Sequence, residues 1–282
     1  MTLLFMTSCG DQRETFERET GAGSQPEICS EADCIVKEAE TILYGKGSSA
    51  AVKHVEGKTS SLPLGANVCH DALHRLGESA VDSYSETLGE LELTACAGGF
   101  LHGLFSGFGG EFNWVERAVE ICSPFKDLQA LLCKHGYGHA AVAGSTSVDE
   151  AMRRCYSITT ADGAVYANEV PLVELCSDGA FMEVVVKVES GEWREADPIS
   201  TCNALEGWAA WGCWRQMSRV LEPGLLSEYA KACTGFDSYL GEACSVGVAE
   251  AIVEDYSGDE DLCSFLPQYV DLCVERIRGR GF

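Results

Sequence analysis

Basic residues are scarce in this sequence. Its 282 residues include 20 lysines and arginines against 44 aspartates and glutamates, a formal net charge of −24. Such a chain is repelled by nucleic acid and by anionic lipid. No basic patch reverses the balance locally, because Arg276, Arg278 and Arg280 have the positions of a helix C-terminal charge and a frayed tail. We therefore expect no nucleic-acid partner.

Long apolar runs and the common catalytic motifs are missing as well. No stretch of 18 or more apolar residues occurs, so we expect no transmembrane helix in the folded part. The sequence has no CxxCH, GxSxG, P-loop or HExxH motif, and no GxGxxG after a strand. These absences argue against covalently bound haem, a serine nucleophile and a phosphate-binding loop.

Cysteine, in contrast, is abundant. The 15 cysteines are spread along the chain and are not bunched as CxxC pairs. Cytosolic proteins rarely carry so many cysteines without metal or redox motifs, so the pattern indicates an oxidising compartment and structural disulfides. With Cys9 set apart, 14 cysteines remain, which leaves none over as a nucleophile.

The N-terminus resembles the end of a bacterial lipoprotein signal. A short apolar stretch is followed by the small residues Thr7 and Ser8, and then by Cys9 and Gly10. In bacterial lipoproteins the cysteine at this place is lipidated. The resemblance implies that residues 1–8 are a signal remnant and that Cys9 anchors the chain in the cell envelope, in the periplasm or at the cell surface. Residues 9–27 are polar and predict a flexible tether, so the lipid would be the only membrane contact.

From residue 28 onward the apolar spacing predicts an all-α protein. We expect helices over 28–43, 68–77, 83–97, 115–122, 127–135 and 148–157, the last capped by Ser147. Residues 45–66 are expected to be loose, and the glycines over 98–110 to make that part irregular. Residues 184–188 are β-branched and predict either the only strand or a helix end. Residues 28–195 would form a histidine-rich domain, and residues 196–282 a cysteine-rich one packed on it as one unit.

Cysteine pairs recur at one spacing of ten or eleven residues. The pairs are Cys122 and Cys133, Cys202 and Cys213, Cys233 and Cys244, and Cys263 and Cys273. The last three pairs repeat with a period of about thirty residues, the length of a helix–turn–helix unit. Each pair either closes its own hairpin or bonds to a neighbouring helix, Cys202 to Cys244 and Cys213 to Cys233. We favour the first scheme because Thr234-Gly235 is typical of a turn. The expected fold is all-α, a solenoid or bundle of disulfide-stapled helical hairpins with at most one short strand pair.

Five of the six histidines lie in three similar phrases rich in cysteine and glycine. They are His70, His74, His102, His135 and His139. His70 and His74 are four residues apart, and so are His135 and His139. This spacing places both rings of a pair on one helix face, as two ligands of one metal ion require. In an oxidising compartment thiols are consumed as disulfides, and imidazole remains the main ligand for zinc, copper or iron. The sequence therefore predicts one shared transition-metal site. The sixth, His54, is expected on an exposed loop or short helix without a role.

Carboxylates are expected to complete this site. Glu183 and Glu111 are candidates as a ligand or general base, and Asp178 is a further option, although an aspartate before glycine more often forms a turn. A haem held between two histidines is less favoured than a transition-metal ion. Three functions are open: a metal-dependent oxidoreductase or hydrolase, a non-catalytic metal-handling lipoprotein, and an α-solenoid interaction module whose histidines only fill the core. The sequence does not specify a small-molecule or protein partner.

Overall fold

The computed structural model describes residues 32–62, 65–82, 88–167, 169–193, 197–221, 223–255 and 258–279. These residues form fourteen α-helices, three 3-10 helices and one antiparallel pair of two-residue strands, β1 (Tyr166–Ala167) and β2 (Val170–Pro171). The prediction of an all-α fold with at most one strand pair is confirmed. Within the described ranges, no helix has both the length and the apolar character needed to cross a bilayer. The expected signal remnant, Cys9 and the tether lie outside these ranges.

The helices are short and follow one another closely. The first half of the chain holds α1 (Ala32–Lys46), α2 (Ser48–Thr59), α3 (Gly65–Ala80), α4 (Glu90–Thr94), η1 (Ala95–Gly98), α5 (Gly99–Phe108), α6 (Trp114–Cys122) and α7 (Asp127–Ala143). The second half holds α8 (Val148–Asp162), α9 (Leu172–Glu189), α10 (Pro198–Asn203), α11 (Gly207–Gln216), η2 (Met217–Val220), α12 (Pro223–Cys233), α13 (Ser238–Asp255), η3 (Glu260–Phe265) and α14 (Val270–Gly279). Ser147 caps α8 as expected, because its side chain accepts a hydrogen bond from the backbone N–H of Glu150.

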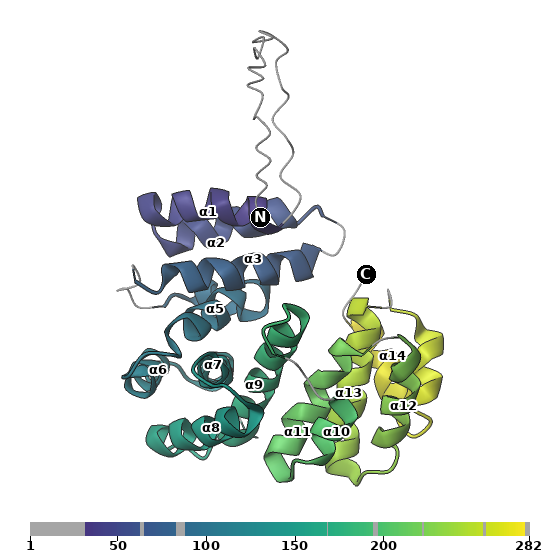
Figure 1. Cartoon of the computed structure of the whole chain (residues 1–282). Helices are drawn as coiled ribbons and strands as arrows, with labels where there is room; N and C mark the ends of the chain where they lie inside the picture. Colours follow the sequence, from purple (N-terminus) through teal and green to yellow (C-terminus); the bar gives the residue numbers. More distant parts are fainter. Residues whose placement is uncertain are drawn as a thin grey trace, which may run out of the picture.

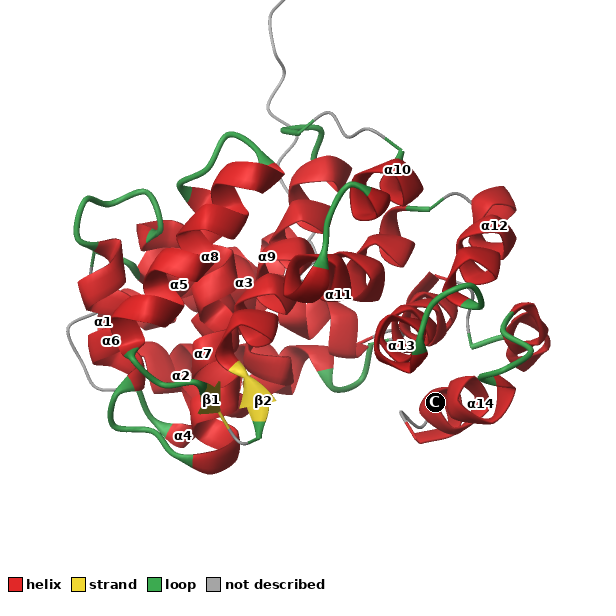
Figure 2. Ribbon diagram, turned by 90° about the horizontal axis from the view of Figure 1, so that it is seen from below, coloured by secondary structure: helices red, strands yellow, loops and turns green. Residues whose placement is uncertain are grey.

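A continuous row of helices forms the centre of the molecule. Each odd-numbered helix from α3 to α11 packs on the next odd-numbered one, and α14 packs on α13 at the end of the row (Figure 1). The hairpin of α1 and α2 packs on α3, while α6, α8 and α12 flank the row. Figure 2 shows β1 and β2 as a small hairpin beside this helical body. The boundary expected at residue 195 lies outside the described residues, and α9 before it packs on α11 after it.

Two glycine-rich segments are more regular than expected. Helix α7 continues through Gly136 and Gly138 to Ala143, and α5 is an unbroken helix where an irregular stretch was expected. Glycine inside a helix costs about 1 kcal/mol relative to alanine. Here the cost is offset by close packing, because a Cβ atom at Gly138 would overlap backbone atoms of Ala180 on α9. Tertiary contacts therefore decide the helix where local propensity opposes it.

Other expectations for local structure were wrong. Residues 45–66, which were expected to be loose, contain α2, and this helix buries Ala51, Val52 and Val55. His54 also lies on α2, and its Nε2 is 2.9 Å from Glu38 Oε2. Residues 184–188 are part of α9, so the strand alternative is excluded. Of the helix expected over 83–97, residues 83–87 lie outside the described ranges. The remainder forms α4 and then η1, whose Cys96 and Ala97 have positive φ angles.

Disulfides close the helical hairpins, as the favoured scheme predicts. The four expected bonds are Cys122–Cys133, Cys202–Cys213, Cys233–Cys244 and Cys263–Cys273. The alternative pairing between neighbouring hairpins is wrong. The structure adds Cys69–Cys96 and Cys155–Cys176, and Cys34 is disulfide-bonded as well. So many disulfides indicate an extracytoplasmic domain, because cytosolic thiols are kept reduced.

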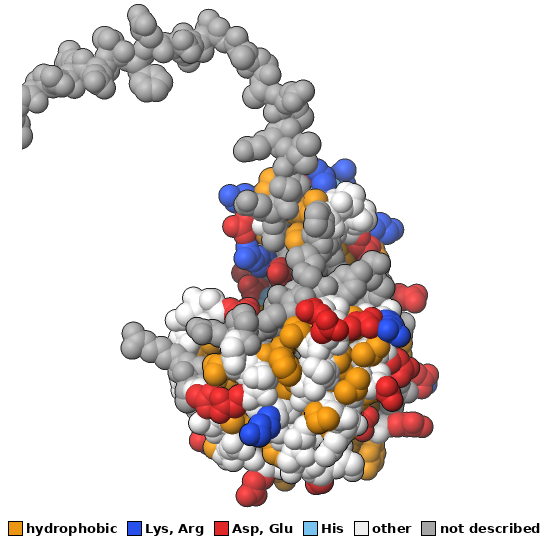
Figure 3. Space-filling model, turned by 90° about the vertical axis from the view of Figure 1, so that its right-hand side faces the viewer, with side chains coloured by type: hydrophobic (Ala, Val, Ile, Leu, Met, Phe, Trp, Pro, Cys, Tyr) orange, Lys and Arg blue, Asp and Glu red, His pale blue; other side chains and the backbone are white. Residues whose placement is uncertain are grey.

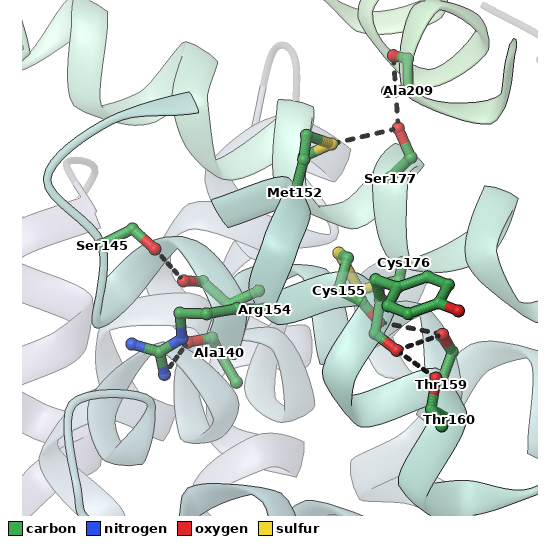
Figure 4. The surroundings of a disulfide bond; sticks show 12 residues. Ala140, Ser145, Met152, Arg154, Cys155, Thr159, Thr160, Cys176, Ser177 and Ala209 are labelled. Atoms are coloured by element: carbon green, nitrogen blue, oxygen red, sulfur yellow. Dashed lines mark hydrogen bonds between the residues drawn. A yellow bond between two sulfur atoms is a disulfide. The ribbon is translucent and has the colours of Figure 1, made fainter. Parts of the chain in front are cut away.

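The bond between Cys155 and Cys176 fixes α8 to α9, the helix that carries two carboxylates described below (Figure 4). The next residue, Ser177, donates a hydrogen bond to the carbonyl oxygen of Ala209 on α11 at 3.5 Å. These contacts hold α9 against α8 and α11. Acidic side chains are spread over the face shown in Figure 3, and the less numerous basic side chains lie mainly in its upper part.

Replacing both Cys233 and Cys244 with alanine is expected to lower the free energy of unfolding by about 2–3 kcal/mol. The bond closes a loop of 11 residues, and its loss frees that loop in the unfolded chain. Denaturant titration of the double variant measures the change. Glu242→Ala, at an exposed position of α13 near Cys244, is the matched control and should stay within about 0.5 kcal/mol of the wild type. Equal stability of the two variants would refute a structural role for this bond.

Candidate metal centre

Four consecutive helices of the row meet around the clustered histidines. Helix α3 carries His70 and His74, and α5 carries His102. Helix α7 carries His135 and His139. Neighbouring ring centroids lie 4.4 to 6.4 Å apart, so the three sequence phrases form one cluster. Helix α9 places the side chains of Asp178 and Glu183 beside these rings. Most of the cluster is buried: His139 is 1% exposed and Glu183 is 4% exposed.

Three ring nitrogens of the cluster are buried and have no hydrogen-bond partner among the described residues. They are Nδ1 of His102, Nε2 of His135 and Nε2 of His139. A buried polar atom without a partner costs about 1–3 kcal/mol. One ring nitrogen from each of these three histidines can be chosen so that all three nitrogens lie within 4.8 Å of one another. This group of histidines can therefore hold a metal ion.

The opposite nitrogens of two of these rings face carboxylates. His135 Nδ1 lies 3.4 Å from Asp178 Oδ2, and His139 Nδ1 donates a hydrogen bond to Glu183 Oε2 at 2.9 Å. A ring whose Nδ1 carries the proton has its lone pair on Nε2. This carboxylate–histidine arrangement is the one that orients metal-ligating histidines in proteins.

A second group of possible ligands consists of His74, His139 and Glu183, again with donor atoms within 4.8 Å of one another. His74 Nε2 lies 3.3 Å from Glu183 Oε2. Ser106 on α5 donates a hydrogen bond to the same carboxylate oxygen at 3.0 Å, and its hydroxyl lies 3.5 Å from His74 Nε2. The two groups share His139.

The geometry separates His70 and Glu111 from both groups. His70 Nδ1 donates a hydrogen bond to the carbonyl oxygen of Cys96 at 2.9 Å, and its ring lies beside that of His102. Glu111 lies between α5 and α6, where Arg117 donates two hydrogen bonds to its carboxylate at 2.9 and 3.1 Å. The structure thus brings Glu183 to the histidines and leaves Glu111 at the surface. Asp178 lies inside α9 and not in a turn.

Burial and charge set the protonation of the cluster. Burial lowers the pKa of His102 and His135, and it lowers the pKa of His70 to about 4. Burial also lowers the pKa of His139 to about 4, although Glu183 opposes this shift. The rings of the first group are therefore neutral at pH 7, the form that binds metal.

His74 differs from the other rings. Burial lowers its pKa, but hydrogen bonds to Glu183 and Glu78 outweigh burial and raise the pKa of His74 to about 9. The same contacts act on the carboxylate. Burial raises the pKa of Glu183, but hydrogen bonds from His139 and His74 hold it well below its usual range. Glu183 is therefore an anion at the centre of the cluster.

The rings of His102 and His139 stack, with centroids 4.4 Å apart and planes 13° from parallel. A histidine binds metal through a lone pair in the plane of its ring. One of the two rings therefore has to turn about its Cβ–Cγ bond before both lone pairs point at one ion.

Sequence reasoning missed a chain of polar contacts behind His135. Asp178 forms an ion pair with Arg215 Nε at 2.9 Å and accepts a hydrogen bond from Gln216 at 2.6 Å. Arg215 Nη2 also lies 3.3 Å from Oε1 of Glu250 on α13. This chain of contacts extends from α7 through α9 and α11 to α13.

A signal for these residues exists in the sequence. In four helices of the row a polar residue follows a glycine by three positions: Gly103 and Ser106, Gly136 and His139, Gly212 and Arg215, and Gly247 and Glu250. The glycine and the residue three positions later lie on the same helix face. Each of these glycines packs against the preceding helix of the row, so the polar residues on these faces meet across successive helices.

No protein-family model and no curated protein matches the sequence, and no solved structure matches the fold. The function is therefore argued from the site alone.

Proposed function

We propose that this protein is a cell-envelope lipoprotein that binds a transition-metal ion through His102, His135 and His139. The observation that carries the proposal is that these rings converge with three buried nitrogens that have no partner within the described residues. Imidazole nitrogens suit zinc, copper and iron. Histidines that only filled the core would leave three unsatisfied atoms, each destabilising by about 1–3 kcal/mol, whereas a bound ion would satisfy the nitrogens that ligate it.

The compartment follows from the other features of the chain. The disulfides require an oxidising environment, and Thr7-Ser8-Cys9 supports a lipid anchor at Cys9. We propose that this lipid is the only membrane contact and that residues 9–27 tether the helical part to it. The net charge of −24 argues against nucleic acid as a partner.

A metal-dependent hydrolase or oxidoreductase is the second candidate function. Three histidine ligands leave a tetrahedral ion with one open position, as in catalytic zinc sites. The alternative is a non-catalytic role in metal handling, in which a fourth ligand closes the coordination sphere. A haem is disfavoured, because rings that stack at 4.4 Å leave no room for a porphyrin between them.

Metal content tests the proposal. The full chain, made in an oxidising compartment and reconstituted in turn with zinc, copper and iron, is expected to retain at least one ion per molecule after dialysis, measured by mass spectrometry. The His102→Ala/His139→Ala double variant should lose this ion, because two of the three ligands are gone. His54→Ala is the matched control, since His54 lies outside the cluster and pairs with Glu38. A wild type without metal, or a folded double variant with undiminished metal, would contradict the proposal.

A further inference from the structure

The two ligand groups share one residue, and they use opposite sides of its ring. His139 Nε2 is one of the buried nitrogens without a partner among the described residues, while Nδ1 of the same ring faces Glu183 Oε2 at 2.9 Å. The two nitrogens of an imidazole point in different directions, so one ring can serve two different ions. We propose that the centre is dinuclear and that His139 bridges the two ions as an imidazolate. This inference rests on the proposed metal-binding function.

The donor atoms of the second group lie close to the spacing of a coordination sphere. Ligand atoms at 2.0–2.2 Å from a tetrahedral ion are about 3.3–3.6 Å from one another. In the structure, Glu183 Oε2 lies 3.3 Å from His74 Nε2 and 2.9 Å from His139 Nδ1. Ser106 Oγ lies 3.0 Å from that oxygen and 3.5 Å from the His74 nitrogen. An ion among these atoms would displace the proton of His74 to solvent and replace the contacts of Glu183 with the two rings, and the Ser106 hydroxyl would be the fourth donor.

Charge also favours a second ion at this place. The first group consists of three neutral rings, whereas the second contains the Glu183 carboxylate, which is 4% exposed. Buried cations are tolerated when anions compensate them. Bridging removes the Nδ1 proton of His139 to solvent and adds a further negative charge between the ions. Glu183 and the imidazolate together offset half of the charge of two divalent ions, while Asp178 beside His135 is already paired with Arg215.

The outer contacts of the rings fit two ions as well. Metal-ligating histidines usually direct their second nitrogen at a carboxylate or carbonyl. His135 directs Nδ1 at Asp178, and His74 directs Nδ1 at Glu78 Oε1 at 3.3 Å. The Glu78 side chain is 46% exposed, so it lies on the outer side of His74. His139 differs from these two rings. The carboxylate that its Nδ1 contacts is Glu183, which is itself a member of the second ligand group.

Counting bound ions tests the dinuclear centre. Zinc titration against a chromophoric chelator is expected to give two ions per wild-type chain. His74→Ala removes a ligand of the second group only and should leave one ion, and His135→Ala removes a ligand of the first group only and should also leave one. His54→Ala should keep two. One ion in the wild type, unchanged in His74→Ala, would overturn the dinuclear centre and leave the proposed function standing, whereas no ion in the wild type would overturn both.

Electron paramagnetic resonance of the copper(II) protein tests the bridge. Two copper(II) ions on one imidazolate are antiferromagnetically coupled, so the wild type with two ions should give a strongly reduced signal at low temperature. His74→Ala with one copper should give the full signal of one isolated ion. Two full, independent signals from the wild type would exclude the bridge.

Discussion

Gly103→Ala is expected to lower the free energy of unfolding by about 3 kcal/mol, although it adds only one methyl group. Gly103 lies where α5 meets α3, and a Cβ atom there would overlap the carbonyl oxygen, the carbonyl carbon and Cα of His74. These are backbone atoms of a helix, so they can move only if α3 and α5 separate. That separation also moves His74 away from Ser106 and Glu183, so we expect weaker metal binding as well.

Gly57→Ala is the matched control for this prediction. Gly57 also lies within a helix, α2, but nothing is within 4 Å of the Cβ that alanine would add. Alanine there should stabilise the protein by about 0.5–1 kcal/mol, because it restricts the unfolded chain and favours the helix. Denaturant titration of both variants measures the two effects. Equal stability of the two would show that α3 and α5 are not in backbone contact.

Arg215→Met is expected to lower the free energy of unfolding by about 3–5 kcal/mol. Burial would lower the pKa of Arg215, but Asp178 and Glu250 outweigh it and raise that pKa, so the guanidinium stays charged. Methionine has a similar length but removes the cation that these two buried carboxylates share. Because Asp178 faces His135, the metal affinity should fall together with the stability.

The control for Arg215→Met is Arg278→Met. Arg278 pairs with Glu260 at 2.6 Å, but both side chains are well exposed, and exposed ion pairs contribute little to stability. The unfolding midpoint of the Arg278→Met variant should equal that of the wild type. If both arginine variants unfolded at the wild-type midpoint, the chain of contacts from His135 to Glu250 would have no energetic role.

Local patterns were sufficient for much of this fold. The spacing of Cys233 and Cys244, with the turn residues Thr234-Gly235 between them, predicts a closed hairpin because both ends of the loop are near in sequence. The four-residue spacing of His135 and His139 likewise places both rings on one side of a helix. Such features depend on neighbours along the chain, so they can be predicted from the sequence.

Contacts between distant segments could not be predicted in this way. Gly136 and Gly138 oppose a helix locally, and only the packing of α9 against α7 makes the helix favourable there. Glu111 and Glu183 were equal candidates in the sequence, and the choice between them depends on which helix packs on α7. Arg215 had no apparent role until α11 was placed against α9.

The most direct test of a buried histidine metal centre is anomalous X-ray scattering from a crystal grown with zinc and measured at the zinc absorption edge. We expect an anomalous peak between α5 and α7, with bonds of about 2.0–2.1 Å to nitrogens of His102, His135 and His139. A second peak at His74 and Glu183 would place the other ion of the dinuclear centre. Anomalous peaks confined to surface carboxylates, with the five rings packed as before, would exclude a buried histidine metal centre.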